Sequence, residues 1–222
     1  MLLQNLNVNQ LMTQIKSLHK EPFPHMIIEN FYDPDELKLI WEELTFLTKP
    51  KKLVEAKHFG GIVDATNSHA LCLDEIYRDY SGDDDGPNFR NLSNILTLNR
   101  KLFNDEILTE FAKTHDSCRL IKYCNSDLTK VRYYHDGEYY KPHTDFSMNF
   151  LGLYYTHKEP KKFTGGDLIF PYYNSQLTCD NNSMILMPGW VEHGVTKVSI
   201  KESDYYDGWG RYCISSFINV ND

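Results

Sequence analysis

The second half of the chain is the most constraining part of the sequence, because it consists of short apolar and aromatic runs separated by turn residues. From Cys118 onward, segments rich in Tyr, Val, Ile and Phe alternate with Gly, Pro and Asn. This pattern predicts β-strands over residues 120–123, 130–135, 150–155, 167–170, 183–187, 194–198 and 211–220. Many short strands at such spacing are typical of a β-barrel or a jelly roll.

The first half of the chain shows helical periodicity instead. Residues 1–20 carry apolar side chains every three or four positions, which predicts an amphipathic helix. Another helix is predicted over residues 34–47, because Asp33 can cap it and a proline suits its first position. Residues 92–114 return to helical spacing, whereas segment 23–28, which contains a proline, is predicted to be extended.

These two patterns predict an α+β fold with a double-stranded β-helix, or jelly-roll, core and N-terminal helices packed on one side. The chain of 222 residues fits a single domain over residues 1–222. Within that domain, residues 1–117 are expected to supply the helices and loops. Residues 118–222 are expected to form the jelly-roll core.

Residues 48–90 are the least regular part of the sequence. Gly60-Gly61 and the acidic run Asp83-Asp84-Asp85 mark loops in this segment. Long irregular segments in compact domains are usually lids or binding loops. We therefore expect a lid over residues 53–89, with a solvated surface loop as the alternative. Its acidic run would favour a substrate with Lys or Arg near the reacting group.

Charge and cysteine content restrict the classes of partner and compartment. The chain carries 23 Lys and Arg against 31 Asp and Glu, a net charge of −8, which argues against nucleic-acid binding. Its five cysteines form no CxxC pair, and no secretory signal or membrane-spanning apolar run is apparent. The sequence thus predicts a cytoplasmic protein without nucleic-acid or membrane partners. Either a monomer or a homodimer is compatible with it.

The segment from Val131 to Asp145 contains the first candidate for chemistry. Alternate residues of a strand face the same side, so His143 and Asp145 would project together from a strand end. An imidazole nitrogen and a carboxylate oxygen at one point suit a divalent first-row metal with open coordination positions. The best candidate for a third ligand is His193, which lies far enough downstream for several intervening strands to return it to the first pair.

Arg211 begins the last apolar run of the sequence. An arginine there points inward only if a carboxylate awaits it, because burying a lone charge is costly. Its planar guanidinium matches a carboxylate through two hydrogen bonds. The alternative is an exposed arginine on an edge strand.

Several ordered motifs resemble the prolyl 4-hydroxylase branch of the iron(II)/2-oxoglutarate dioxygenases, which includes the collagen-type and oxygen-sensing enzymes. The resemblance spans about residues 119–220 and is looser in the first half of the chain. It is carried by Tyr134-x-x-Gly137-x-x-Tyr140-x-Pro142-His143-x-Asp145, Gly165-Gly166-Asp167-Leu168-x-Phe170-Pro171, Pro188-Gly189-x-x-x-His193-Gly-Val and Arg211-Tyr212.

Carried over residue by residue, the resemblance implies that His143, Asp145 and His193 bind the iron. It implies that Arg211 binds the distal carboxylate of 2-oxoglutarate. Three tyrosines also match family positions. Tyr155 resembles a residue that supports that carboxylate, Tyr134 an aromatic residue at the cosubstrate pocket and Tyr140 a residue beside the substrate. For Tyr134 and Tyr140, packing in the core of the barrel is the alternative.

The resemblance also implies the cofactors and the reaction. Fe(II), 2-oxoglutarate and O₂ are implied, with ascorbate as an optional reductant. The cosubstrate is converted to succinate and CO₂ while an unactivated C–H bond is hydroxylated, and the expected substrate is a prolyl residue of a peptide or protein.

Two positions depart from the family. The segment between His193 and Arg211 is longer than usual, which makes Lys197 a rival partner for the cosubstrate carboxylate. Phe217 stands where the oxygen-sensing enzymes carry a tryptophan.

Three alternatives stay open at this point. The chain could be a jelly-roll binding module without turnover, or an oxygenase that acts on a free amino acid. It could also be a metal-dependent hydrolase, for which Glu192 is the only general base near the triad that the sequence offers.

Overall fold

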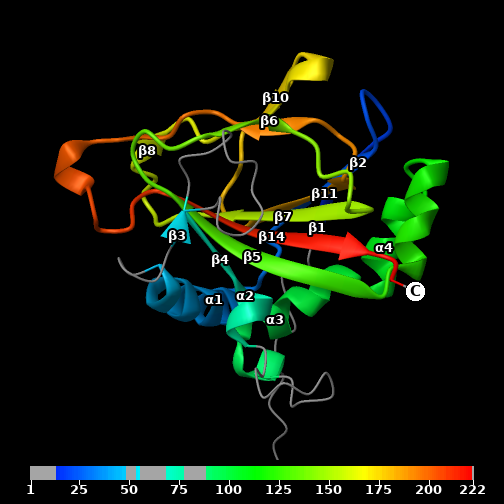
Figure 1. The fold of residues 1–222 in the computed structure, drawn as a ribbon, viewed down its shortest axis with the longest axis horizontal. Coiled ribbons are helices and arrows are strands. Elements are labelled where there is room, and N and C mark those ends of the chain that lie inside the picture. The colour runs from blue at the N-terminus through cyan, green and yellow to red at the C-terminus, as the bar shows by residue number, and fades with distance from the viewer. Residues whose placement is uncertain (1–13, 49–53, 56–68, 78–88, 222) are drawn as a thin grey trace, which may run out of the picture.

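A computed structural model describes residues 14–48, 54–55, 69–77 and 89–221 of the chain. Its main feature is a large antiparallel sheet, with a smaller sheet on one face and helices on the other (Figure 1). The acidic run at residues 83–85 lies outside the described residues. No helix in the described part of the chain is long and apolar enough to cross a membrane.

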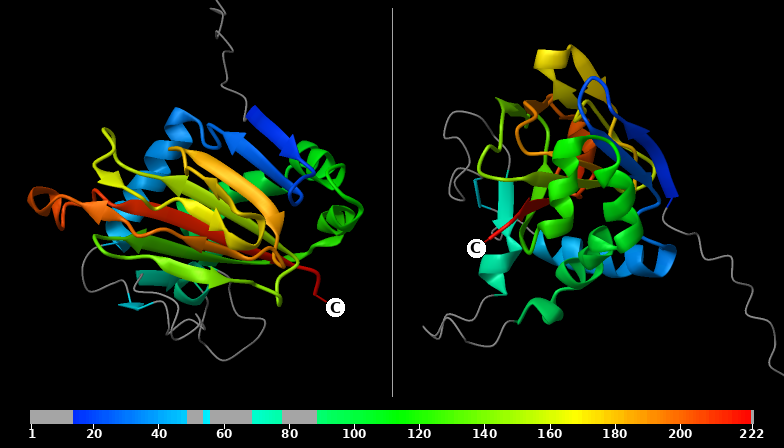
Figure 2. Two further views of the ribbon diagram at one scale, coloured as in Figure 1. Left: turned by 90° about the horizontal axis from the view of Figure 1, so that it is seen from above. Right: turned by 90° about the vertical axis from the view of Figure 1, so that its right-hand side faces the viewer.

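The large sheet has eight strands among the described residues. From edge to edge they are β1 (Gln14–His19), β2 (His25–Glu29), β11 (Ser183–Pro188), β7 (Phe150–Thr156), β14 (Arg211–Asn219), β5 (Ser126–Tyr134), β4 (His69–Cys72) and β3 (Val54–Glu55). The β1–β2 hairpin lies beside β11 at one edge (Figure 2, left, blue).

The small sheet lies over the middle of the large one. Its strand order is β10 (Ser175–Leu177), β9 (Leu168–Phe170), β12 (His193–Val195) and β6 (Tyr140–His143). A separate pair contains β8 (Phe163–Thr164) and β13 (Ser199–Ile200). The two facing sheets form the predicted jelly-roll core.

The helices cover the opposite face of the large sheet (Figure 1). They are α1 (Pro34–Leu47), α2 (Leu73–Ile76), α3 (Asn94–Leu98) and α4 (Asp105–Ala112). Short 3₁₀ helices span Phe89–Leu92, Asn99–Phe103, Asp116–Tyr123, Pro171–Tyr173 and Glu202–Asp204. The predicted cap of α1 is confirmed, because the Asp33 side chain accepts hydrogen bonds from the backbone nitrogens of Asp35 and Glu36.

The central strands are buried on both faces, because each face contributes to a different apolar core. Along β7, Tyr154 packs in the core shared with the helices, whereas Leu153 and Tyr155 pack in the core between the sheets. On β14, Ile214 faces the helices and Cys213 faces the small sheet. This alternation follows from the two-residue period of a strand.

Three local predictions are wrong. Within segment 1–20, the described residues Gln14–His19 form strand β1, which pairs with β2, and exposure alternates from residue to residue over 15–19. Segment 120–123 belongs to a 3₁₀ helix, in which only Cys118 and Ile121 are fully buried. Within the expected lid, residues 69–72 form β4, which pairs with β5 in the large sheet. In each case packing against neighbouring elements overrode the local pattern.

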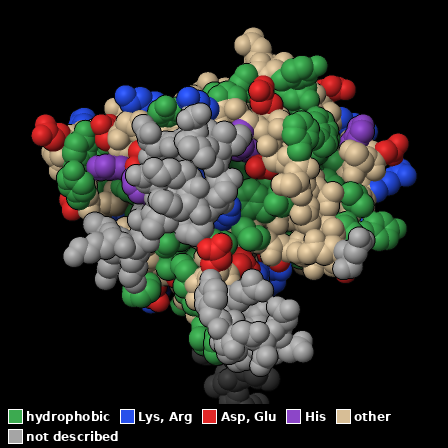
Figure 3. Space-filling model, viewed as in Figure 1, with side chains coloured by type: hydrophobic (Ala, Val, Ile, Leu, Met, Phe, Trp, Pro, Cys, Tyr) green, Lys and Arg blue, Asp and Glu red, His purple; other side chains and the backbone are tan. Residues whose placement is uncertain are grey.

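Both kinds of charged side chain are interspersed on the face seen in Figure 3. Basic groups lie beside acidic ones along the outline of the molecule, with apolar side chains between them.

Candidate active site

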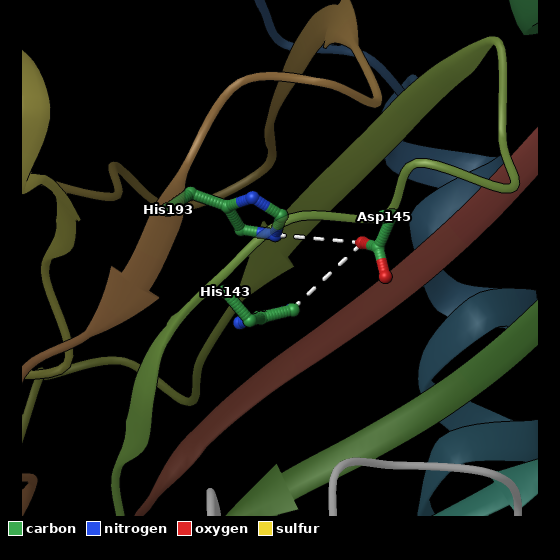
Figure 4. Close-up of side chains that lie close together, drawn as sticks. All are labelled: His143, Asp145 and His193. Carbon is green, nitrogen blue, oxygen red and sulfur yellow. Dashed lines mark ion pairs between the residues drawn. The ribbon is translucent and has the colours of Figure 1, made fainter.

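Two histidines of the small sheet face each other across a strand pair. His143 is the last residue of β6 and His193 is the first residue of β12, and the antiparallel register places them directly opposite. Directly opposed residues point to the same side of a sheet. Their ring centroids are 4.4 Å apart. Strand pairing thus brings together two side chains that lie far apart in the sequence (Figure 4).

Asp145 completes the group from the loop that follows β6. Its Oδ2 atom lies 3.8 Å from Nε2 of His143 and 3.7 Å from Nε2 of His193, as the dashed lines in Figure 4 show. Its backbone nitrogen donates a hydrogen bond to the Gly189 carbonyl oxygen at 2.9 Å. A Cβ atom at position 189 would lie 2.2 Å from the Met148 carbonyl oxygen. The loop therefore needs glycine there to hold Asp145 against β11.

The protonation of both imidazoles suits metal binding. Nδ1 of His143 lies 3.0 Å from the Lys141 carbonyl oxygen, and Nδ1 of His193 lies 2.9 Å from that of Val191. A carbonyl only accepts, so each Nδ1 carries the hydrogen and each Nε2 keeps its lone pair toward Asp145. Burial, followed by the neighbouring His143, lowers the pKa of His193 to about 4. Burial also lowers the pKa of His143.

The three ligand atoms lie within 4.8 Å of one another. Two neutral imidazoles and one carboxylate on one side of a point match the donor set of a facial metal site. Among the described residues, no other group of three His, Cys, Asp or Glu side chains comes close enough to share an ion.

Arg211 is a buried cation at the start of β14. Its side chain is only 2% exposed, and its Nε and Nη1 atoms have no hydrogen-bond partner among the described residues. Nη2 lies 3.6 Å from Sγ of Cys179, a weak acceptor. No carboxylate of the described chain pairs with Arg211 in an ion pair. Because an unpaired buried guanidinium is costly, this position favours an anion that the described residues do not supply.

The three predicted tyrosines surround these charged groups. The guanidinium carbon of Arg211 lies 4.5 Å from the ring centroid of Tyr155 and 4.9 Å from that of Tyr134. The Tyr155 hydroxyl is buried and has no partner among the described residues, so it can donate to the same anion. Tyr140 lies nearer the triad, since its ring centroid is 4.2 Å from that of His143.

All these residues line one cavity between the two sheets, with about 560 Å³ of empty space counted out to its open mouth. Its lining comprises Lys130, Arg132, Tyr134, Tyr140, His143, Asp145, Leu153, Tyr155, Leu168, His193, Val195, Arg211, Cys213, Ser215 and Phe217. The rival residues Lys197, which is exposed, and Glu192 are not among them.

The cavity includes charged residues that the sequence motifs missed. Lys130 and Arg132 precede Tyr134 on β5 at alternate positions, so the strand period directs all three to the same face. The sequence signal that could have identified them is their spacing of two and four residues from Tyr134, which places them on the same face of the strand. It is easily overlooked because neither basic residue belongs to a recognised motif.

No family model matches the sequence, and no curated protein sequence matches it significantly. Solved structures do match. A prolyl 4-hydroxylase from Pseudomonas putida superposes with a TM-score of 0.56 at 12% identity, covering 89% of this chain and 93% of that one.

Two further structures cover similar shares. An oxidoreductase of the 2OG-Fe(II) oxygenase family from Burkholderia pseudomallei gives a TM-score of 0.56 at 14% identity, over 89% and 86% of the chains. A viral collagen prolyl hydroxylase from Paramecium Bursaria Chlorella virus-1 gives 0.53 at 12% identity, over 95% and 96%. The chain therefore has the jelly-roll fold of prolyl 4-hydroxylases and other 2OG-Fe(II) oxygenases.

Proposed function

We propose that the chain is an iron(II)- and 2-oxoglutarate-dependent dioxygenase that hydroxylates a prolyl residue of a peptide or protein. The observation that carries the proposal is the meeting, in one cavity, of a His-Asp-His group and a buried arginine without a carboxylate partner among the described residues. A metal and a carboxylate-bearing cosubstrate fit these two features. Structures of the same fold include prolyl hydroxylases.

In this proposal His143, Asp145 and His193 hold the iron. Their Nε2 and Oδ2 atoms already converge, so binding the ion needs little rearrangement of the chain. When bound, Fe(II) with 2-oxoglutarate and O₂ supplies the oxidation, in which the cosubstrate becomes succinate and CO₂ and one oxygen atom enters a substrate C–H bond.

The cosubstrate's distal carboxylate is assigned to Arg211 and Tyr155. The guanidinium offers two free donor atoms, and the buried hydroxyl of Tyr155 offers a third. Tyr134 also packs against the guanidinium, with its ring centroid 4.9 Å from the guanidinium carbon, and limits its movement. Charge-assisted hydrogen bonds of this kind fix both the position and the orientation of a carboxylate.

The remaining walls of the cavity exclude water from the reacting groups. Leu153 of β7, Leu168 of β9 and Val195 of β12 supply apolar surface to the cavity lining. Tyr140 packs against His143 and is assigned to the substrate side of the metal. A dry site protects a reactive centre from side reactions.

Succinate release tests the reaction class. The protein is incubated with Fe(II), 2-oxoglutarate, O₂ and a panel of proline-containing peptides, and each peptide is examined for the mass of one added oxygen atom. We expect succinate in proportion to hydroxylated peptide. Succinate without a hydroxylated prolyl peptide would reject the substrate but keep the class. The absence of any succinate would favour a binding module.

A further inference from the structure

Strand β5 contributes a row of cationic side chains to the cavity that the proposed cosubstrate does not use. Lys130 and Arg132 lie four and two residues, respectively, before Tyr134, the last residue of β5. The register of β5 against β14 places Arg132 opposite Cys213 and Lys130 opposite Ser215, while Tyr134 faces Arg211. The row therefore runs along the cavity wall away from Arg211.

Arg132 is buried beside the triad. It is 8% exposed, and its Nη1 atom is fully buried without a hydrogen-bond partner among the described residues. Its guanidinium carbon lies 5.0 Å from the ring centroid of Tyr140, and that ring is 4.2 Å from the His143 ring. Arg132 thus has a donor without a partner among the described residues, and only the ring of Tyr140 separates its guanidinium from His143.

The charges around the cavity do not balance without a further anion. Asp145 is the only carboxylate among the described lining residues, and the proposed iron uses it. In the proposed function Arg211 binds the distal carboxylate of 2-oxoglutarate, and the charge of the other carboxylate would be offset by the positive charge of the metal. Arg132 then has no anionic partner among the residues that the structure describes, although a buried guanidinium needs one.

Lys130 extends the same cationic surface farther along β5 from Arg211. It lines the cavity on the strand face shared with Arg132, and its Nζ atom lies 5.1 Å from the ring centroid of Phe217. An arginine and a lysine two residues apart can share one carboxylate, because strand residues i and i+2 point the same way.

We propose that Arg132, assisted by Lys130, binds a carboxylate of the primary substrate, so that this enzyme acts on prolyl groups with a carboxylate on or next to the ring. The inference rests on the proposed function and specifies its substrate. The carboxylate can be the α-carboxylate of a terminal prolyl group or the side chain of a neighbouring acidic residue. The cavity thus favours the opposite charge to the one expected from the acidic run at residues 83–85.

Binding calorimetry tests the charge preference without turnover. The full chain is loaded with Mn(II) and 2-oxoglutarate under argon and titrated with two matched pairs of probes. One pair is N-acetylproline and N-acetylprolinamide, and the other is N-acetyl-prolyl-aspartyl amide and its asparaginyl counterpart. We expect at least one acidic probe to bind about tenfold or more tightly than its neutral partner. The pair that shows the difference identifies the source of the carboxylate.

Variants assign the preference to the residue. Arg132→Gln should reduce the acid-to-amide ratio to about twofold or less, Arg132→Lys should keep part of it, and Lys130→Gln should reduce it less. Arg119→Gln, on an exposed side chain of the 3₁₀ helix Asp116–Tyr123, is the matched control and should change nothing. Affinity for 2-oxoglutarate should stay within about twofold in Arg132→Gln.

Equal binding of acidic and neutral probes by the wild-type protein would overturn the inference, and so would binding of neither. This comparison needs no variant, so it decides the matter even if Arg132→Gln fails to fold. A ratio unchanged by Arg132→Gln, or a large loss of 2-oxoglutarate affinity in that variant, would also overturn it. Succinate release by the iron-loaded wild type is scored separately, so loss of the charge preference is distinguishable from failure of the oxygenase proposal.

Discussion

At the scale of single residues, the two histidines of the site are oriented by the backbone in the same way. In each, Nδ1 faces the carbonyl oxygen of the residue two positions earlier, which is Lys141 for His143 and Val191 for His193. This contact fixes which ring nitrogen carries the hydrogen, while Tyr140 packs against the ring of His143. The nitrogen that faces Asp145 is consequently set by local chain geometry, and a substitution at His143 or His193 would remove a candidate ligand without dismantling a network.

Replacing either histidine should abolish turnover while the fold persists. We expect His143→Ala and His193→Ala to reduce succinate formation to background, because a facial triad has no spare ligand. Asp145→Ala should weaken metal binding in a titration. The control is His115→Ala, an exposed histidine on the helical side of the chain. Near-normal succinate formation by His143→Ala or by His193→Ala would show that the histidine replaced in that variant is not a ligand.

Replacing Arg211 should affect the cosubstrate specifically. Truncating one partner of a buried charge pair costs about 2–5 kcal/mol, so Arg211→Ala should raise the KM for 2-oxoglutarate about thirtyfold or more. Lys197→Ala is the matched control, since Lys197 is exposed and lies outside the cavity lining. Steady-state kinetics with varied 2-oxoglutarate measures both. If the lysine variant shows the larger effect, the assignment of the carboxylate is wrong.

At the scale of elements, the sequence predicted features that depend on neighbouring residues in the chain and missed features that depend on how the strands pair. The helix after Asp33 was predictable because its cap and its proline lie within a few residues of each other. His143 and Asp145 were predictable for the same reason. Strand β1 was not, because it is fixed by its pairing with β2. Arg132 was missed because its position depends on which face of β5 meets the small sheet.

The contact between β7 and the helical layer should be sensitive to a single methyl group. A Cβ atom at Gly152 would lie 2.5 Å from Cδ2 of Leu102, in the 3₁₀ helix Asn99–Phe103. Gly152→Ala should therefore lower the free energy of unfolding by about 1–3 kcal/mol through overpacking. Urea unfolding measures the loss. The double variant Gly152→Ala, Leu102→Ala should be more stable than the sum of the single effects predicts, and strict additivity would contradict the contact.

The β1–β2 hairpin should make stability depend on pH through His25. Burial is the main cause that lowers the pKa of His25 below 6.5, so the folded state binds this proton less well than the unfolded state. Its contribution is fully present above pH 6.5 and is lost as the pH falls toward the folded-state pKa. Unfolding of the apo-protein between pH 8 and pH 5 should show this decline, and His25→Gln should flatten it relative to His115→Ala. An unchanged slope would remove His25 as the cause.

At the scale of the whole molecule, the metal-binding group joins parts that the backbone pairs separately. His143 and His193 lie on the small sheet, whereas the Asp145 loop is hydrogen-bonded to Gly189, directly after β11 of the large sheet. An ion bound to all three residues would cross-link the two sheets. Stability should therefore report metal binding directly.

Adding a divalent metal should raise the melting temperature of the apo-protein. A ligand at a hundredfold excess over its Kd stabilises by about 2.7 kcal/mol, which corresponds to roughly 5–10 °C for a domain of this size. Thermal unfolding with Mn(II), with and without EDTA, measures the shift. His193→Ala should lose it, whereas His115→Ala should keep it. An equal shift in both variants would place the bound ion elsewhere.

The side chains of strand β14 form two sets, one that stabilises the helical side of the fold and one that lines the cavity. Tyr212, Ile214 and Ile218 pack with the helices, while Cys213, Ser215 and Phe217 border the cavity. Exchanges in the second set leave the first untouched. Substitutions at Cys213, Ser215 and Phe217 can therefore change which substrates the pocket binds while the packing on the helical face of β14 is kept. New substrate preferences can then evolve, or be designed, through mutations along this one strand.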